Sequence, residues 1–160
     1  MNFIKGVDVS VSKDLESHGA SYRLNGKEED LFKLLKQCGI NMVRIRIWAD
    51  PYDESGNSYG GGGNDLQTTI EIAKRAVKNG MEFLLDFHYS DFWADPGKQV
   101  KPKALENLTG VALETAVYLH TVNTLKALRN EQLIPKMVQV GNEITNGLLW
   151  PDGHVNQIDT

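Results

Sequence analysis

A short apolar segment near the end of the chain, Val138 to Val140, runs through Gly141 into the pair Asn142-Glu143. This pattern predicts a carboxyl group at the carboxyl end of a buried parallel strand, which is where α/β barrels carry out their chemistry. Such a carboxyl group can act as a general acid and then as a general base, and the neighbouring amide can bind a sugar hydroxyl. Glycoside hydrolysis normally requires two carboxyl groups. Glu143 is therefore a candidate for one of the two.

Polar residues also stand at the carboxyl ends of three other strand-like segments, at positions 3–9, 42–47 and 82–87. Parallel strands present their carboxyl ends at the same edge of a sheet, so these side chains are expected to converge. Convergence from four strands is typical of a functional site. A purely structural network of ion pairs at the end of the barrel is the alternative. The residues concerned are Asp8, Arg44, Arg46, Asp86 and His88, together with Asn142 and Glu143.

The two arginines of segment 42–47 share one face of the strand, because side chains alternate along a strand. The opposite face is apolar and is expected to pack against helices, so Arg44 and Arg46 point into the barrel. An unpaired charge in that position is costly. We therefore expect carboxylate partners for them, and Asp86 is well placed to be one. Parity alone leaves open which of the two arginines orients the reacting groups.

Aromatic residues gather in the loops that follow these strands, and they include all three tryptophans of the chain. Aromatic faces are apolar and stack on the C–H faces of sugar rings, so this grouping predicts a carbohydrate cleft. Trp93 and Trp150 are the candidates for direct contact with a sugar. The full set is Trp48, Tyr52, Tyr89, Phe92, Trp93 and Trp150.

Helical patterns separate the predicted strands, of which the fourth spans 137–140, and this alternation predicts an α/β fold with a parallel sheet. The apolar faces of the expected helices run from 31 to 38, from 66 to 77 and from 113 to 128, and the third helix is expected to continue down to Pro135. Cys38 stands at the apolar end of the first helix, where a packed thiol is expected. Glycines and capping residues mark the helix boundaries. These are Gly39, Asn64, Asp65, Gly80 and Thr109.

Four strand–helix units make half of a (β/α)8 TIM barrel, since a closed barrel needs roughly 200 to 250 residues and the chain has 160. We therefore predict that residues 1–160 form a single partial domain with barrel units one to four. A doubly wound open sheet is the competing solution, but it usually has a glycine-rich phosphate turn after its first strand. The segment from Gly6 to Ser10 has no such turn. The run from Gly60 to Gly63 lacks the Lys-Ser or Lys-Thr of a phosphate loop, and we interpret it as a connector.

Composition argues against several kinds of partner. The net charge is −4 and no basic patch is present, so nucleic acid is not an expected partner. No apolar run approaches the roughly 18 residues of a membrane span. The first residues lack the pattern of a signal peptide, which leaves the localisation open. Neither His18 nor His120 has a metal-spaced neighbour, and we expect no metal and no cofactor.

Four motifs, in order and over nearly the whole chain, resemble the arabinogalactan endo-β-1,4-galactanases, glycoside hydrolase family 53. The motif after the third strand is the most specific of them, whereas an Asn-Glu ending alone indicates only the wider clan of retaining barrel glycosidases. Leu149-Trp150-Pro151 also agrees with the family. The motifs are Gly6-Val7-Asp8-Val9-Ser10, Val43-Arg44-Ile45-Arg46-Ile47-Trp48, Asp86-Phe87-His88-Tyr89-Ser90-Asp91-Phe92-Trp93-Ala94-Asp95-Pro96 and Val138-Gln139-Val140-Gly141-Asn142-Glu143.

The resemblance implies a (β/α)8 barrel that cleaves β-1,4-galactan, a side chain of pectin, with retention at the anomeric carbon. It implies that Glu143 is the acid/base residue, that Asn142 precedes it, that His88 is the histidine of the third strand and that Arg44 is the best match to the arginine of the second strand. The family nucleophile lies on the seventh strand, beyond Thr160, and has no counterpart in this sequence. We therefore expect the isolated chain to be inactive. Members of the family usually act outside the cell.

A half barrel is expected to leave its first and fourth strands as bare edges. Such edges favour self-association or pairing with a complementary C-terminal half. Three other interpretations of the function stay open. The chain is part of another β-1,4-glycanase of the same clan, a carbohydrate-binding fragment without catalysis, or an inert truncated product.

Overall fold

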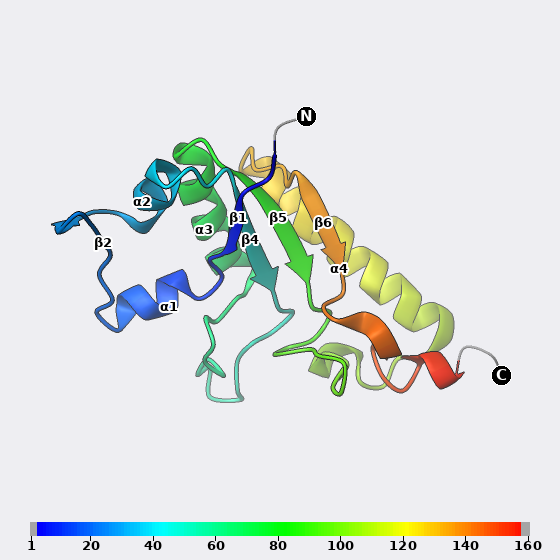
Figure 1. Ribbon diagram of the computed structural model, residues 1–160. Helices are drawn as coiled ribbons and strands as arrows, with labels where there is room; N and C mark the ends of the chain where they lie inside the picture. Colours follow the sequence, from blue (N-terminus) through cyan, green and yellow to red (C-terminus); the bar gives the residue numbers. More distant parts are fainter. Residues whose placement is uncertain (1–2, 158–160) are drawn as a thin grey trace.

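The computed structural model describes residues 3–157, and its centre is a four-stranded parallel sheet (Figure 1). The strand order is β1-β4-β5-β6, so strands that follow one another along the sheet are joined by helical connections. The register pairs Asp8 with Arg44 and Arg46 with Asp86, which places the polar ends of the first three strands side by side. The four strands are β1 (Gly6–Asp8), β4 (Met42–Ile47), β5 (Glu82–Phe87) and β6 (Met137–Val140).

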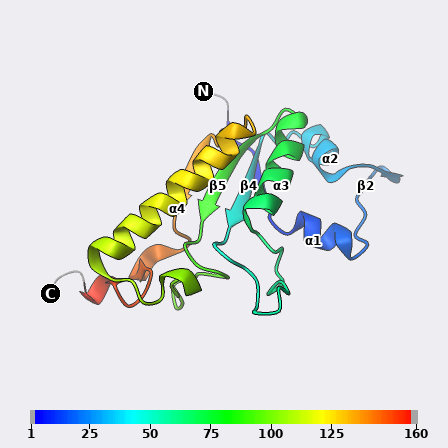
Figure 2. The same ribbon diagram turned by 180° about the vertical axis from the view of Figure 1, so that it is seen from behind.

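Helices cover one face of this sheet and leave the other face open. In Figure 2, α3 (Leu66–Lys78) and α4 (Gly110–Asn130) lie across the back of the sheet. In Figure 1 no helix lies over the front of the strands, and the loops hang from their carboxyl ends. The shorter helices are α1 (Ser12–Ser17) and α2 (Leu31–Gln37). Within residues 3–157, none of the helices has both the length and the apolarity that a membrane span requires.

Small elements decorate the loops. A hairpin formed by β2 (Arg23–Leu24) and β3 (Lys27–Glu28) projects beside α1. A second hairpin, β7 (Gly147–Leu148) with β8 (Gly153–His154), follows the site segment. The 3-10 turns are η1 (Lys103–Leu105), η2 (Ile144–Asn146) and η3 (Val155–Gln157).

Capping explains where the helices begin. The Asp30 carboxylate accepts from two backbone N–H groups of the first turn of α2, and Asp65 does the same for the N–H of Thr68 in α3. Gly39 and Gly80 follow their helices with positive φ, as predicted. Thr109 is the N-cap residue of α4, but its side chain makes no capping hydrogen bond.

The strand faces divide as the alternation of residues predicts. Val43, Ile45 and Ile47 are buried against α3, while the neighbouring arginines point to the open face. β5 contributes its own apolar set to the same core. The fold class predicted from sequence is therefore confirmed: these are the parallel strand–helix units of the N-terminal half of a (β/α)8 barrel.

Two local predictions were wrong, and two small elements were not predicted. The first strand is only Gly6–Asp8, because Phe3 and Ile4 are exposed and have no strand beside them. The region between the first strand and α2 holds α1 and the β2–β3 hairpin, which the sequence patterns did not predict. Cys38 is exposed rather than packed, because it is the C-cap residue of a helix that has already turned away from the core.

The edges of the sheet are unpaired within residues 3–157, as predicted for a half barrel. β1 pairs only with β4, and β6 pairs only with β5. The β6 edge is also apolar, with Met137, Val138 and Val140 all exposed. Exposed apolar edge strands of this kind readily pair with another chain.

Phe32 anchors α2 to the rest of the half barrel. Its side chain is fully buried, and the Arg75 guanidinium from α3 lies 4.4 Å above its ring. Arg75 in turn makes two hydrogen bonds to Glu16 and one to Asp30, at 2.7 to 2.8 Å. One aromatic ring and one arginine thereby connect α1, α2 and α3.

We predict that Phe32→Ala lowers the free energy of unfolding by about 3 to 5 kcal/mol, because it leaves a cavity beneath Arg75. Phe3→Ala is the matched control, since Phe3 is 81% exposed; that change should stay within about 0.5 kcal/mol. Urea denaturation followed by circular dichroism measures both. Equal losses in the two variants would contradict this role of Phe32.

Candidate active site

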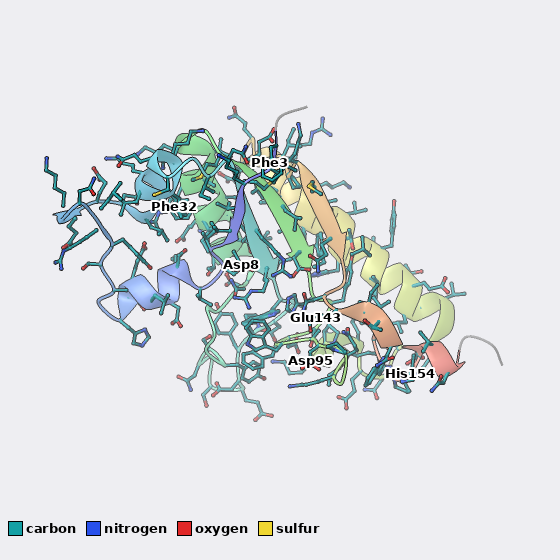
Figure 3. The ribbon with its side chains drawn as sticks, in the orientation of Figure 1. Phe3, Asp8, Phe32, Asp95, Glu143 and His154 are labelled. Carbon is teal, nitrogen blue, oxygen red and sulfur yellow. The ribbon has the colours of Figure 1, made fainter. Side chains whose placement is uncertain are left out.

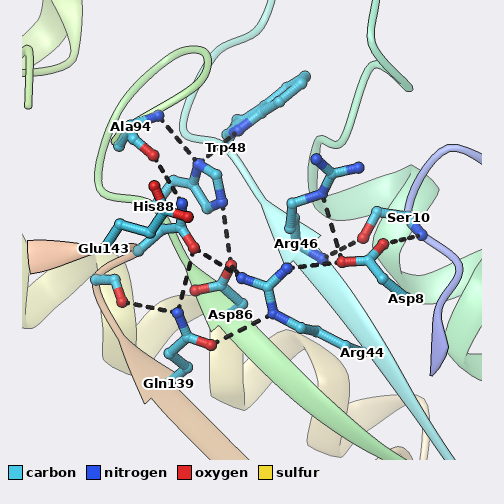
Figure 4. A network of polar contacts seen from close by, with 12 residues as sticks. Asp8, Ser10, Arg44, Arg46, Trp48, Asp86, His88, Ala94, Gln139 and Glu143 are labelled. Carbon is cyan, nitrogen blue, oxygen red and sulfur yellow. Dashed lines mark hydrogen bonds and ion pairs between the residues drawn. The ribbon is translucent and has the colours of Figure 1, made fainter. Parts of the chain in front are cut away.

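Arg44 connects the carboxyl ends of all four strands (Figure 4). Its Nη1 donates to Asp8 of β1 at 2.7 Å, and its Nη2 donates to Asp86 of β5 at 2.5 Å. The same Nη2 donates to Asn142 Oδ1 at 2.8 Å, and Nε donates to Gln139 of β6 at 3.3 Å. A planar guanidinium can make this many directed bonds at once, whereas an ammonium group cannot.

Asp86 and His88 lie fully buried beside Arg44. His88 Nε2 is 3.0 Å from Asp86 Oδ2, but its geometry is not that of a hydrogen bond. The Trp48 indole N–H donates to His88 Nδ1 at 3.1 Å, and the backbone N–H of Ala94 donates to it at 3.4 Å. Indole can only donate, so Nδ1 is an acceptor and a neutral His88 carries its proton on Nε2, facing Asp86.

Arg46 occupies a different environment from Arg44. Its guanidinium lies 4.1 Å from the centre of the Trp93 ring, and its Nε is 3.8 Å from Asp8 Oδ2. The Ser10 hydroxyl accepts from its backbone N–H at 2.8 Å. Burial lowers the pKa of Arg46, and the negative charge of Asp8 opposes that shift. Arg46 therefore contacts an aromatic loop, while Arg44 contacts the Asn142 amide.

Asp8 is shared between the two arginines. Burial of its carboxyl group opposes ionisation, but the backbone N–H and hydroxyl of Ser10 and the charges of Arg46 and Arg44 outweigh that effect, so the pKa of Asp8 lies below its ordinary value. The backbone bond from Ser10 N measures 2.9 Å. Asp8 therefore remains an anion that neutralises part of the arginine charge.

Asn142 is buried and Glu143 is exposed, although they are neighbours in sequence. The Asn142 amide donates to the carbonyl of Ala94 at 2.7 Å. Glu143 has a left-handed backbone, with φ 52° and ψ 43°. Its carboxylate makes no hydrogen bond or ion pair within the described residues. Figures 3 and 4 place it at the carboxyl edge of the sheet, at the end of β6 where the Arg44 network lies.

The loop after β5 packs directly on the Asn142-Glu143 segment. Gln99 is buried in this loop, and its Nε2 donates to the carbonyl of Asn142 at 2.8 Å. Asn146 Nδ2 donates to the carbonyl of Pro96 at 2.8 Å. Sequence reasoning missed Gln99, Gln139 and Ser10 as members of the site. The parity of β6 could have revealed Gln139, but no periodicity marks a glutamine in a long loop.

The aromatic residues do not form one surface. Trp48 is buried beneath the loop after β5 and donates a hydrogen bond to His88, whereas Trp93 is 38% exposed and lies over Arg46. Trp150 lines a separate cavity of about 580 Å³ with Pro151, Lys103 and other residues, none of which belongs to the Arg44 network. The site therefore brings together Arg44, Arg46, Asp8, Asp86, His88, Asn142 and Trp93 but not Trp150.

No group of three or more histidine, cysteine, aspartate or glutamate side chains that could hold a metal ion occurs in the part of the chain that the structure describes.

We predict that Arg44→Met lowers the free energy of unfolding by about 3 to 5 kcal/mol, since it leaves the buried Asp86 carboxylate without its cation. The double change Arg44→Met with Asp86→Leu should be less destabilising than Arg44→Met alone. Chemical denaturation of the wild type, the two single variants and the double variant forms a thermodynamic cycle. If the double variant loses as much free energy of unfolding as the two single variants together, the two side chains do not interact.

We also predict a contribution of Asp8 to acid sensitivity. The folded pKa of Asp8 is lowered, so the unfolded chain binds the proton more tightly. The resulting stability is present above about pH 4 and is lost as the pH falls through the folded value. Asp8→Asn should therefore flatten the dependence of unfolding free energy on pH below about pH 5. Identical slopes for wild type and variant would contradict the proposed charge pairing.

Comparison with known proteins agrees with this geometry. The family described as Glycosyl hydrolase family 53 matches residues 4–160. The endo-beta-1,4-galactanase of Bacillus subtilis (strain 168) is 54% identical over 91% of this chain and 34% of its own length. The arabinogalactan endo-beta-1,4-galactanase of Cellvibrio japonicus (strain Ueda107) is 43% identical over 88% of this chain and 36% of its own length.

A solved structure gives the same result in three dimensions. The GH53 catalytic domain of Ignisphaera aggregans superposes with a TM-score of 0.93 at 50% identity, over 96% of this chain and 43% of that one. The chain thus spans between a third and a half of the length of these relatives. With the family matched over nearly all its residues, the chain belongs to glycosyl hydrolase family 53.

Proposed function

We propose that this chain supplies the acid/base half of a retaining endo-β-1,4-galactanase that acts on galactan and arabinogalactan side chains of pectin. The observation that carries the proposal is the Asn142-Glu143 pair, joined through Arg44 to the ends of the other three strands, in a member of this family. The names of the relatives support the choice of substrate. A polymeric substrate cannot enter a cell, so the proposal also places the reaction outside it.

Glu143 is assigned the acid/base role. It protonates the departing glycosidic oxygen in the first step and then deprotonates a water molecule in the second. Its exposed carboxylate, free of protein partners within residues 3–157, is accessible to a substrate in this role. His88 is assigned to the floor of the cleft, where it positions Asp86 and the loop that carries Trp93.

Asn142 is assigned to the sugar. One N–H of its amide is taken by the carbonyl of Ala94, and its oxygen accepts from Arg44. An amide has two N–H donors, so one remains for a sugar hydroxyl. A contact of this kind to the 2-hydroxyl strengthens in the transition state of glycoside hydrolysis.

Arg44 is assigned to the second carboxylate, in preference to Arg46. A guanidinium has five N–H donors, and four of them are used by Asp8, Asp86, Asn142 and Gln139. The remaining N–H is available to orient and ionise a nucleophilic carboxylate. Neither Asp8 nor Asp86 is proposed as the nucleophile, because Asp86 is fully buried and Asp8 stands on β1, at the opposite edge of the sheet from Glu143.

The nucleophile is therefore proposed to come from a complementary half of the barrel. Retention requires its carboxylate roughly 5 to 5.5 Å from Glu143. The free edges of β1 and β6 are the places where the additional strands would pair. Self-association of two copies through these edges is the competing way to cover them, and gel filtration separates the two possibilities.

Trp93 is proposed to stack on a galactose ring, since its indole is partly exposed at the mouth of the site. Trp150 is proposed to contact a more distant sugar, because its cavity shares no residue with the Arg44 network. Arg46 supports Trp93 from below at 4.1 Å.

We predict that the 160-residue chain alone releases no reducing ends from β-1,4-galactan. Mixed with the part of the Bacillus subtilis relative that follows the matched region, it should become active. Glu143→Gln should lower that activity by about 100-fold to 10,000-fold, because general acid–base catalysis usually contributes a factor of this size to the rate. Hydrolysis by the isolated wild-type chain would mean that it holds a nucleophile of its own. Testing galactan, β-1,4-glucan and mannan in parallel distinguishes a galactanase from another glycanase.

Trp93 is exposed, and within residues 3–157 the strand ends carry no second carboxylate that is both exposed and unpaired. These two observations favour one other candidate, carbohydrate binding without catalysis. Affinity electrophoresis in galactan separates the two. Binding lost in Trp93→Ala, kept in Glu143→Ala and accompanied by inactivity of the mixed halves would support the binding function.

A further inference from the structure

Gln99 is a buried residue of the loop after β5, and its side chain contacts the backbone of the Asn142-Glu143 segment. Its side chain is 2% exposed. Nε2 donates to the carbonyl of Asn142 at 2.8 Å and to that of Asp95 at 3.0 Å, and it lies 3.5 Å from the carbonyl of Glu143. The two shorter bonds use both N–H donors of the amide.

The backbone of Glu143 requires such support. Its φ of 52° and ψ of 43° lie in the left-handed region, which residues other than glycine adopt only at a cost in free energy. Its carboxylate has no partner within the described residues that could hold it in place. The direction of this side chain is therefore set by the peptide groups on either side of Glu143.

Further hydrogen bonds hold the loop after β5 in place against the segment that carries Glu143. The backbone N–H of Trp150 donates to the carbonyl of Gln99 at 2.7 Å. Two side-chain amides donate in the opposite direction, from Asn142 to Ala94 and from Asn146 to Pro96. Of the loop side chains 94–99, Gln99 is the one that donates to the carbonyl between Asn142 and Glu143.

We propose that Gln99 is a positioning residue for Glu143. By holding the carbonyl of Asn142, its amide fixes the peptide plane that enters the left-handed residue, and so fixes where the Glu143 carboxylate stands. The catalytic meaning of this inference rests on the proposed function, but the structural claim does not.

The first test uses the 160-residue chain and needs no activity. Gln99→Met keeps the length of the side chain and removes both donors, and Gln99→Glu replaces them with acceptors. The probes are the backbone carbon shifts of Glu143 and its coupling between amide and α protons, measured by NMR on isotope-labelled protein. Asn146→Ala is the matched control, since it removes a tether of the same loop at Pro96 and leaves the carbonyl of Asn142 untouched.

We expect both Gln99 variants to move Glu143 out of the left-handed conformation and the control to leave it there. The melting temperatures of all variants are recorded as well, because a merely structural glutamine would alter melting and leave the Glu143 signals unchanged. Wild-type signals of Glu143 in a folded Gln99→Met chain would overturn the proposal.

The second test uses the complemented halves described above. Gln99→Met should lower kcat on galactan about tenfold or more while KM stays within about twofold, because a displaced acid fails mainly in the transition state. A galactoside with a dinitrophenolate leaving group needs little protonation in the first step, and kcat/KM reports that step alone, so its kcat/KM should change by about twofold at most. Equal losses of kcat/KM on both substrates would overturn the proposal. Inactive wild-type halves would refute the proposed function instead, and the NMR result would still decide the role of Gln99.

Discussion

The polar end of this half barrel depends on the charge of Arg44. A guanidinium on the inner face of a central strand must be compensated, and here the neighbouring strands supply the compensation: Asp8 from β1 and Asp86 from β5. Once these ion pairs form, two of the three remaining N–H groups bind Gln139 and Asn142. The pairing of one cation thus brings the ends of four strands together and sets the position of Asn142, directly before Glu143.

The loop after β5 forms a second layer over this network. Trp48 fixes the tautomer of His88 from below, and Arg46 supports Trp93 at its outer side. The same loop donates to and accepts from the segment that carries Glu143. As a result, Glu143 is held by its backbone, while its carboxylate has no partner within residues 3–157. Such an arrangement suits a group that must give up a proton and take it back at a substrate.

Sequence reasoning predicted the strands and the side chains that they carry, because strand alternation is a local property. Val43 and Ile45 faced the helices, and Arg44 and Asp86 met on the other face, as parity required. Prediction from sequence failed for features that depend on contacts between residues far apart in the chain. The shortness of β1 and the exposure of Cys38 depend on neighbours far along the chain. The β2–β3 hairpin was missed although Asn25-Gly26, a strong turn signal, was present. Trp150 was grouped with the site from its position after β6, yet the bridge between Val100 and Trp150 carries it to a cavity of its own.

We propose that the strand ends converge on one sugar-binding hollow with Glu143 at its reactive end. A crystal structure of the complemented halves with a bound galacto-oligosaccharide tests it most directly. We expect the Glu143 carboxylate to lie within about 2.6 to 3.2 Å of a glycosidic oxygen, and the Asn142 amide to bind the 2-hydroxyl of the adjoining sugar. A well-ordered oligosaccharide that avoids Glu143 and Asn142, for example one bound only beside Trp150, would contradict it.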